Sequence, residues 1–418
     1  MRLAVVACGL AFASVGLVRA DVPLQVVEVE GYATLAAHRA NDPVASFRPD
    51  PRNANASRDG QWRTDGDTLA ALQFGWDATP SLRAVWQVLA KDDVTARFRP
   101  RTEWLYLDWQ ATPALHVRAG RMVLAAFAQS QTRHVGYAQV NARPVDTVYQ
   151  LNPATYLDGA GLRWEHGDLE LTLDAGRSRL NLTTGHYDFH RAAVAAAGWR
   201  HGAWHVRAAW SDYRLSADLP QLARLFALAA SGASACTNCA DVLDDRVAMH
   251  RQHARLGSLS VAHDDGGPLR WQAEFARRGG STALVPESDG AYALVAWRVS
   301  PRWTPYAALS WLRYREPPLE LRTATGAPAS AHDFNAALDR FLQAPLDRRG
   351  WQLGVRVELS DRLALKVQVD GFRNTRDTTA GQLAGVLLTP LPAALGGPQQ
   401  PAWDGRLRVL SVNLDHVF

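Results

Sequence analysis

The sequence predicts an all-β fold, a closed antiparallel transmembrane β-barrel of sixteen strands. Three observations favour this fold class. Stretches of about ten residues alternate between apolar and polar side chains, their connections are short and long in turn, and tryptophans gather beside the short connections. We therefore expect strands that each present one face to lipid and the other to a lumen.

The composition leaves a barrel and a large soluble globule as alternatives. Of the 418 residues, 47% are hydrophobic, and the mean hydropathy is −0.19. One apolar run, residues 3–18, is too little for a helical membrane protein, which needs several spans of ~20 residues. The 15 Trp, 10 Tyr and 12 Phe argue against disorder. Each strand of a barrel has an apolar face toward lipid and a polar face toward the lumen, so the mean hydropathy of the chain resembles that of a soluble protein.

The first twenty residues have the form of a cleaved signal peptide. A basic start, Met1-Arg2, precedes the apolar run, and a small-residue site ends at Ala20. Residues 21–418 are then a single exported barrel domain. Cleavage of the signal peptide would remove Arg2 and Arg19 and leave 43 basic and 41 acidic residues. This small positive excess does not indicate a surface that binds nucleic acid.

The alternation of apolar and polar side chains predicts each strand in turn. Leu105, Leu107 and Trp109, for example, alternate with Tyr106 and Asp108. An even number of strands is what a closed single-chain barrel needs. The expected strands cover residues 26–38, 67–77, 81–91, 101–111, 114–122, 157–166, 168–178, 191–201, 203–214, 252–264, 269–278, 289–300, 302–315, 350–360, 362–373 and 404–418.

The connections predict the orientation of the barrel. Short ones carry turn residues, as in Gly167-Asp168 and in residues 265–268, Asp-Gly-Gly-Pro. With a periplasmic N-terminus, the short turns face the periplasm and the long loops lie outside. Eight tryptophans on the apolar phase lie near the short turns and predict a membrane-interface girdle, which a soluble sandwich would not need. They are Trp76, Trp109, Trp164, Trp199, Trp204, Trp271, Trp297 and Trp303.

The third long connection, residues 123–156, and its flanks carry a resemblance to a known family. Val117-Arg118-Ala119-Gly120-Arg121 before it and Asp158-Gly159-Ala160-Gly161 after it resemble the corresponding stretch of Gram-negative outer-membrane porins, the sixteen-stranded trimeric kind. The final strand ends on Phe418, similar to the terminal residue that the barrel-assembly machinery reads in such proteins. His416 departs from their usual Tyr or apolar residue.

The resemblance implies a function and a setting. It implies a water-filled channel in the bacterial outer membrane, embedded in lipids and lipopolysaccharide, for passive diffusion of small hydrophilic solutes. It also implies a homotrimer, a third loop folded inward as the constriction, and no cofactor or catalytic residue. Barrels of ~16–18 strands are wide enough for an aqueous lumen.

Charged side chains on the polar phase predict the lining of the channel, since charged rings set ion selectivity. The lumen-facing cations balance the lumen-facing acids. In the third loop Arg133, His134 and Arg143 outnumber Asp146, which predicts a weak preference for anions; alternatively these arginines pair with wall carboxylates and only hold the loop. The wall cations are Arg83, Arg118, Arg163, Arg207, Arg270, Arg298, Arg356 and Lys366.

Three long connections carry further patterns. Cys236 and Cys239 predict a small disulfide clip, although with His250 and His253 they also resemble a zinc ligand set of unusual spacing. Residues 219–229 and 333–342 have helical apolar spacing and predict helices packed on the barrel mouth or, more specifically, a lid. Residues 39–66 are compatible with a mobile surface loop, a subunit latch or a calcium-assisted loop.

Two other functions compete with a diffusion porin. A substrate-selective outer-membrane channel has the same sequence pattern. An outer-membrane barrel enzyme would need a Ser/His/acid set, and the chain has no Gly-x-Ser-x-Gly motif. We therefore expect no enzymatic activity and no metal.

Overall fold

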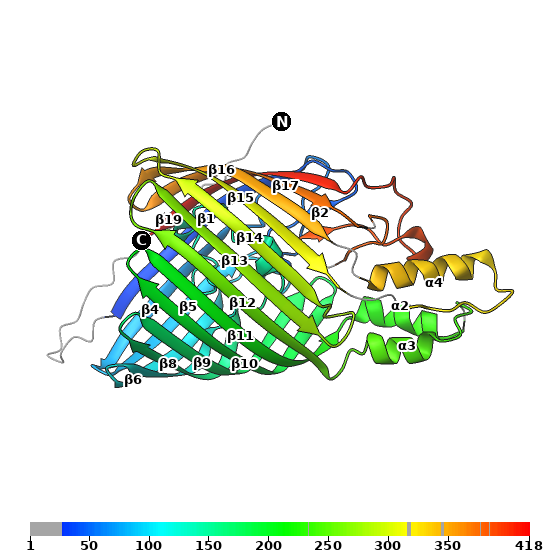
Figure 1. Ribbon diagram of the computed structural model, residues 1–418, viewed down its shortest axis with the longest axis horizontal. Helices are drawn as coiled ribbons and strands as arrows, with labels where there is room; N and C mark the ends of the chain where they lie inside the picture. The colour runs from blue at the N-terminus through cyan, green and yellow to red at the C-terminus, as the bar shows by residue number, and fades with distance from the viewer. Residues whose placement is uncertain (1–26, 233, 316–318, 344–346, 377, 384) are drawn as a thin grey trace.

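The protein is a barrel closed by sixteen antiparallel strands, seen from the side in the computed structural model (Figure 1). The structure describes residues 27–418 except 233, 316–318, 344–346, 377 and 384, so the predicted signal peptide lies outside the described residues. The predicted fold class is confirmed. None of the described helices is long and apolar enough to cross a membrane.

The sixteen wall strands match the predicted ones to within a few residues at most ends. They are β1 (Val27–Ala40), β4 (Leu69–Thr79), β5 (Leu82–Lys91), β6 (Arg101–Thr112), β7 (Leu115–Val123), β8 (Tyr156–His166), β9 (Leu169–Leu182), β10 (Gly185–His201), β11 (Trp204–Asp218), β12 (Gln252–Asp264), β13 (Leu269–Gly280), β14 (Ser288–Trp297), β15 (Trp303–Tyr314), β16 (Arg348–Ser360), β17 (Leu363–Asn374) and β19 (Arg406–Val417).

The ladder closes because β1 pairs with β4 on one side and with β19 on the other. Leu35 lies opposite Leu414 in the closing pair, so apolar positions stay on one face across the seam. Phe418 continues this ladder, because its backbone and that of Gly31 donate to each other at 3.0 and 2.8 Å. We call the end with the short connections the turn end and the opposite end the loop end.

The predicted apolar phase lies on the outside of the wall. Leu309, Leu35 and Trp297 are 70%, 65% and 59% exposed, although each belongs to a regular strand. Large apolar side chains on this face have no internal partner to cover them, which is the pattern of a lipid-facing band. Six of the eight predicted girdle tryptophans are exposed, whereas Trp164 and Trp271 are half-buried.

One predicted connection is wrong. Residues 179–190 were expected to form a long loop, but β9 and β10 continue to a hairpin whose connection is only Thr183-Thr184. Gly185 closes this turn with a φ of 140°, which favours glycine. The extra pairs reverse the membrane pattern, because the outward pair Arg179 and Asp188 is polar and the inward pair Leu180 and Tyr187 is apolar. They therefore lack the lipid-facing apolar side chains that mark a membrane strand.

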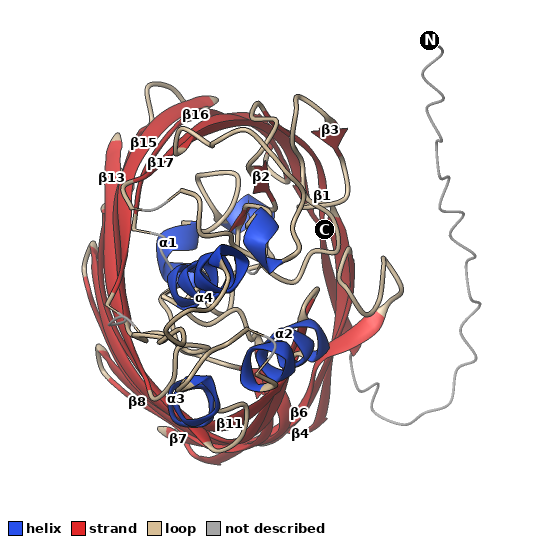
Figure 2. Cartoon of the chain, turned by 90° about the vertical axis from the view of Figure 1, so that its right-hand side faces the viewer, coloured by secondary structure: helices blue, strands red, loops and turns tan. Residues whose placement is uncertain are grey.

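Long connections from the loop end fill the interior of the barrel. Looking along the barrel, the ring of strands surrounds the helix α1 (Asp146–Tyr149) and several loop segments (Figure 2). The largest apolar cluster lies inside the ring, where residues from 122–157 meet inward-facing side chains of β9 to β15. The short elements β2 (Ser46–Phe47), β3 (Trp62–Arg63), β18 (Leu387–Leu388), η1 (Gly136–Ala138) and η2 (Ala393–Leu395) belong to the loops.

Three helices gather at the loop end (Figure 1). They are α2 (Pro220–Ala230), α3 (Cys239–Arg246) and α4 (Ala329–Leu342), and their apolar faces share one cluster that includes Leu243 and Leu338. A disulfide bond joins Cys236 to Cys239 at the start of α3. Both predicted helices are therefore present, and we call the three together the cap.

Candidate functional site

The third long connection, residues 124–155, crosses the lumen as predicted and is anchored to the wall at several points. On one side, Lys366 of β17 donates to the carbonyl oxygens of Gly136 and Asn141 at 2.6 and 3.0 Å. The Gln368 side chain accepts a hydrogen bond from the Ala142 backbone at 2.9 Å. Buried wall side chains thus satisfy backbone groups of the loop that water would otherwise have to reach.

The opposite wall holds the start of the same loop. Ser258 of β12 donates to the Ala126 carbonyl at 2.7 Å, and Glu274 of β13 accepts from the Ala128 backbone at 2.9 Å. Arg207 of β11 donates to the Ala125 carbonyl at 2.6 Å. Because the two walls hold different parts of one connection, the loop spans the lumen rather than lying along one side.

Two predicted constriction residues, Arg143 and Asp146, lie buried in ion pairs. Arg143 contacts Asp67 at 2.7 Å and Asp370 at 3.1 Å, and it donates to the Ser411 hydroxyl at 2.7 Å. Burial disfavours its charge, but the two carboxylates outweigh burial and raise the pKa of Arg143. Asp146 pairs with Arg348 of β16. Both residues therefore form ion pairs with the wall. This agrees with the alternative prediction, in which these charges hold the loop in place instead of forming an open charged ring.

Arg133 and His134 occupy the middle of the lumen. Arg133 donates to the Asn152 carbonyl at 3.4 Å, and its guanidinium lies 5.7 Å from the centre of the Tyr149 ring. His134 lies 3.4 Å from Arg52 and 3.9 Å from Glu103. Burial and then the positive charges of Lys91, Arg52 and Arg133 lower the pKa of His134 well below its ordinary value.

Residues 45–57 of the first long connection also fold inward, which the sequence pattern did not predict. Asp50 contacts Arg52 at 2.7 Å and Lys91 at 3.0 Å, and Arg48, 1% exposed, donates to the Gly385 carbonyl at 2.8 Å. Burial disfavours the Asp50 carboxylate, but the charges of Arg52 and Lys91 hold its pKa well below its usual range. The segment is rich in charged and Asn residues, a composition equally typical of an exposed loop.

The predicted wall cations face inward, and each has a partner. Lys366 and Asp415, both with 0% exposed side chains, pair at 2.9 Å, and Arg118 pairs with Asp174 at 3.2 Å. Arg356 and Arg207 donate to carbonyl groups of the third loop. The remaining four cations have partners near the turn end. The pairs are Arg83 with Glu28, Arg163 with Glu170, Arg270 with Asp264, and Arg298 with the Gly266 carbonyl.

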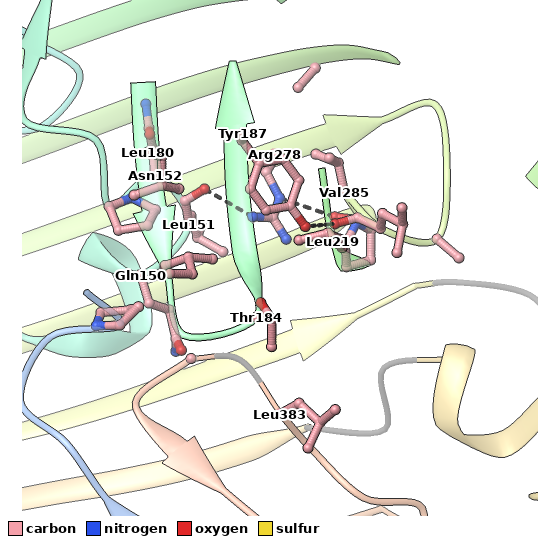
Figure 3. Close-up of a pocket in the computed structure, with 18 of the residues that line it drawn as sticks. Gln150, Leu151, Asn152, Leu180, Thr184, Tyr187, Leu219, Arg278, Val285 and Leu383 are labelled. Atoms are coloured by element: carbon pink, nitrogen blue, oxygen red, sulfur yellow. Dashed lines mark hydrogen bonds between the residues drawn. The ribbon is translucent and has the colours of Figure 1, made fainter. Parts of the chain in front are cut away.

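The loops divide the lumen into separate cavities. The outer cavity, near the loop end, has a volume of about 220 Å³ and a mainly apolar lining (Figure 3). The middle cavity, about 70 Å³, is lined by three cations, Lys91, Arg133 and Arg143, and three carboxylates, Asp50, Asp67 and Asp146. Pro51 and Gln150 line both, so these two cavities are neighbours.

A third cavity, of about 260 Å³, lies toward the turn end. Phe127 and Ser130 of the third loop form one side of it, and the wall residues Arg118 and Glu170 form another. Arg200 and Asp168 from neighbouring short turns also line it. The outer cavity is thus mainly apolar, whereas charged side chains line the other two.

Comparisons with known proteins support the fold alone. No protein-family model and no curated protein matches the sequence. An anion-selective porin from Comamonas acidovorans is similar, at 11% identity and a TM-score of 0.55, over 94% of this chain and 99% of that one. The trimer form of OmpT, an outer-membrane protein of Vibrio cholerae, is 10% identical with a TM-score of 0.52, again over 94% and 99%.

The outer-membrane channel DcaP of Acinetobacter baumannii is a third similar structure. It is 10% identical, with a TM-score of 0.52 over 94% of this chain and 97% of that chain. Each of these likenesses covers nearly the whole barrel, although the sequences share few residues. The chain therefore has the porin-like fold of outer-membrane proteins, a closed barrel of sixteen antiparallel strands.

Proposed function

We propose that the protein is a passive channel of the bacterial outer membrane that selects its solute. One observation carries this proposal: residues 124–155 cross the lumen and divide it into an outer apolar cavity and inner charged cavities. A barrel of this size has room for water, so the loops, rather than the wall, limit passage. A selective channel fits this geometry better than the general diffusion porin that the sequence predicts first.

The apolar cluster inside the barrel supports selectivity. Leu256, Tyr213 and Leu294 point inward from the wall and pack against Val148 and Tyr149 of the third loop's helix. Apolar constrictions restrict ions because water leaves them readily. A wide pore lined by charged rings would instead keep such side chains out of the lumen.

Single-channel recording in a planar bilayer tests the proposal. We expect small conductance steps in KCl, and we expect them to be blocked by the solute that the channel carries. Deleting residues 136–143 of the third loop should enlarge the steps several-fold, because this segment fills the lumen along β16, β17 and β19. Absence of any step from both forms would contradict a channel.

The anion preference that the third loop predicts is part of the proposal, in a weak form. Cations and carboxylates balance in the middle cavity, so only a small field remains to distinguish ions. Reversal potentials in a KCl gradient measure this directly. A clear cation preference of the unmodified protein would contradict it.

We also propose a homotrimer, to which the trimeric form of a structural neighbour lends support. The exposed apolar band of the wall can bury against another barrel as readily as against lipid. Mass measurement of the protein in detergent, with detergent-corrected light scattering, distinguishes three copies from one.

A transport role is favoured over an enzymatic one. The pair most similar to a hydrolase site is His190 with Ser216, whose Nε2 and Oγ lie 2.7 Å apart on β10 and β11. Asp188, two residues before this histidine, is bound by Arg179 and His186. A serine hydrolase needs a group that orients the histidine, and this carboxylate is engaged elsewhere. Unchanged transport in Ser216→Ala would agree with this assignment.

A further inference from the structure

The outer cavity has the shape and lining of a binding site for a small aromatic molecule. Five aromatic side chains face it from different elements, β10, β11, β15 and α4: Tyr187, Phe189, Tyr213, Tyr314 and Phe341. The aliphatic side chains of Leu180, Leu219 and Val285 also line the cavity, and the close-up shows them with Tyr187 (Figure 3). Aromatic rings favour one another in stacked or edge-to-face contact, so this lining favours a ring over a flexible chain.

The cavity also presents polar donors on the side of the third loop. The Nε2 atom of Gln150 is buried and has no hydrogen-bond partner among the described residues. Arg278 of β13 donates to the carbonyl oxygens of Leu151 and Pro286, at 2.9 and 3.1 Å, and to the Ser288 hydroxyl at 3.1 Å. These bonds hold its guanidinium in the lining of the cavity, to which Gln150 also belongs. A buried amide N–H without an acceptor costs free energy that a ligand oxygen would recover.

The size of the cavity limits the ligand. An apolar cavity of ~150 Å³ holds benzene. At about 220 Å³, the outer cavity has room for one ring and one small substituent. Two fused rings with substituents would exceed it.

We propose that the outer cavity binds a single-ring aromatic monocarboxylate. Its ring lies among Tyr187, Phe189 and Tyr213, and its carboxylate accepts hydrogen bonds from Gln150 and Arg278. Carboxylates pair well with guanidinium groups, and the bond is stronger away from water. The inference deepens the proposed function, on which it rests for the route by which a ligand reaches the lumen.

Equilibrium dialysis of the purified full chain in detergent, with radiolabelled benzoate, tests the inference. Benzyl alcohol, which has the same ring and no charge, is measured in parallel. We expect saturable binding of benzoate. Arg278→Gln should weaken benzoate binding about tenfold or more and change benzyl alcohol binding by less than about threefold.

Two further variants separate a lost contact from a damaged fold. Arg277→Gln is the matched control, because Arg277 is the neighbouring residue on the exposed face and pairs with Glu287; it should bind benzoate within about twofold of the unmodified protein. Val285→Trp fills the cavity from the β13–β14 connection and should abolish binding of both compounds.

Several results would overturn the inference. They are an absence of saturable benzoate binding, equal loss of both compounds in Arg278→Gln, and full benzoate binding in Val285→Trp. Conductance is recorded separately in bilayers. A protein that conducts but does not bind benzoate disproves this inference alone, whereas one that binds benzoate but does not conduct disproves the channel.

Discussion

Arg143 is the residue through which the third loop is bound both to the wall and to the first long connection. It compensates the charges of two carboxylates, Asp67 and Asp370, and is itself buried. We expect Arg143→Ala to leave both carboxylates without this partner and to shift the reversal potential toward cations. The measurement is the zero-current potential in a tenfold KCl gradient. Arg58→Ala, an exposed position on the same connection as Asp67, is the control and should leave the potential unchanged.

The buried pair of Lys366 and Asp415 supports a second prediction at the residue scale. Its two side chains are 0% exposed, so removing the lysine leaves a buried carboxylate without its cation. We expect Lys366→Met to lower the free energy of unfolding by about 3–5 kcal/mol. Arg83→Met removes a half-exposed pair with Glu28 and should cost at most about 1 kcal/mol. Urea unfolding in lipid measures both, and equal losses would contradict the prediction.

His134 predicts a dependence of stability on pH. Its lowered pKa means that the folded protein holds the neutral ring, surrounded by Lys91, Arg52 and Arg133. The unfolded chain takes up a proton below its ordinary pKa of about 6.5. Stability is therefore full above about pH 6.5 and is lost as the pH falls, by about 1–2 kcal/mol at pH 5. His134→Gln should show a smaller loss between pH 7.5 and pH 5, and an identical loss would contradict the assignment.

At the scale of elements, the helices of the cap share an apolar core at the loop end of the barrel. Leu338 of α4 is fully buried among side chains of α2 and α3, whereas Ala336 of the same helix is exposed. We expect Leu338→Asp to loosen the cap and to speed its proteolysis between residues 219 and 251, with the barrel intact. Ala336→Asp is the matched control and should leave the rate unchanged. Slow proteolysis of both would show that the barrel mouth, rather than helix contacts, holds the cap.

The two loops that fold inward differ in how far their position could be predicted from the local sequence. Residues 124–155 lie between two runs, 117–121 and 158–161, that resemble the corresponding stretch of porins, and the structure places these residues inside the barrel. Residues 45–57 have no comparable pattern, yet they are also enclosed, through Arg48 and Asp50. Their partners lie on distant parts of the chain, such as Gly385, and no local spacing signals those contacts.

At the scale of the whole molecule, closure of the barrel depends on the C-terminus. Phe418 pairs with Gly31 through backbone hydrogen bonds that any side chain preserves. We expect Phe418→Ala to fold in detergent about as well as the unmodified chain but to assemble more slowly when the barrel-assembly machinery is present. Gel mobility before and after heating follows both reactions. Val417→Ala is the control, and equal slowing in both variants would argue against a terminal signal.

The sequence alone determined the wall of this protein. Strand number, strand order, outward face and short turns follow from a two-residue period and from turn residues, which act over a few positions. Arg278 was also within reach, since it shares the lumen phase with Arg270 and Glu274 on β13. The hairpin at Thr183-Thr184 was missed because its strands continue beyond the apolar band, where the outward-facing side chains become polar.

Only the tertiary structure decided what fills the wall. The ion pairs of Arg143, the enclosure of residues 45–57 and the apolar outer cavity all join segments separated by scores to hundreds of residues. Such contacts depend on which loops lie next to each other inside the closed barrel, and a local pattern of side chains does not specify this. The barrel could therefore be predicted from the sequence, whereas the selectivity that we propose depends on the packing of the lumen.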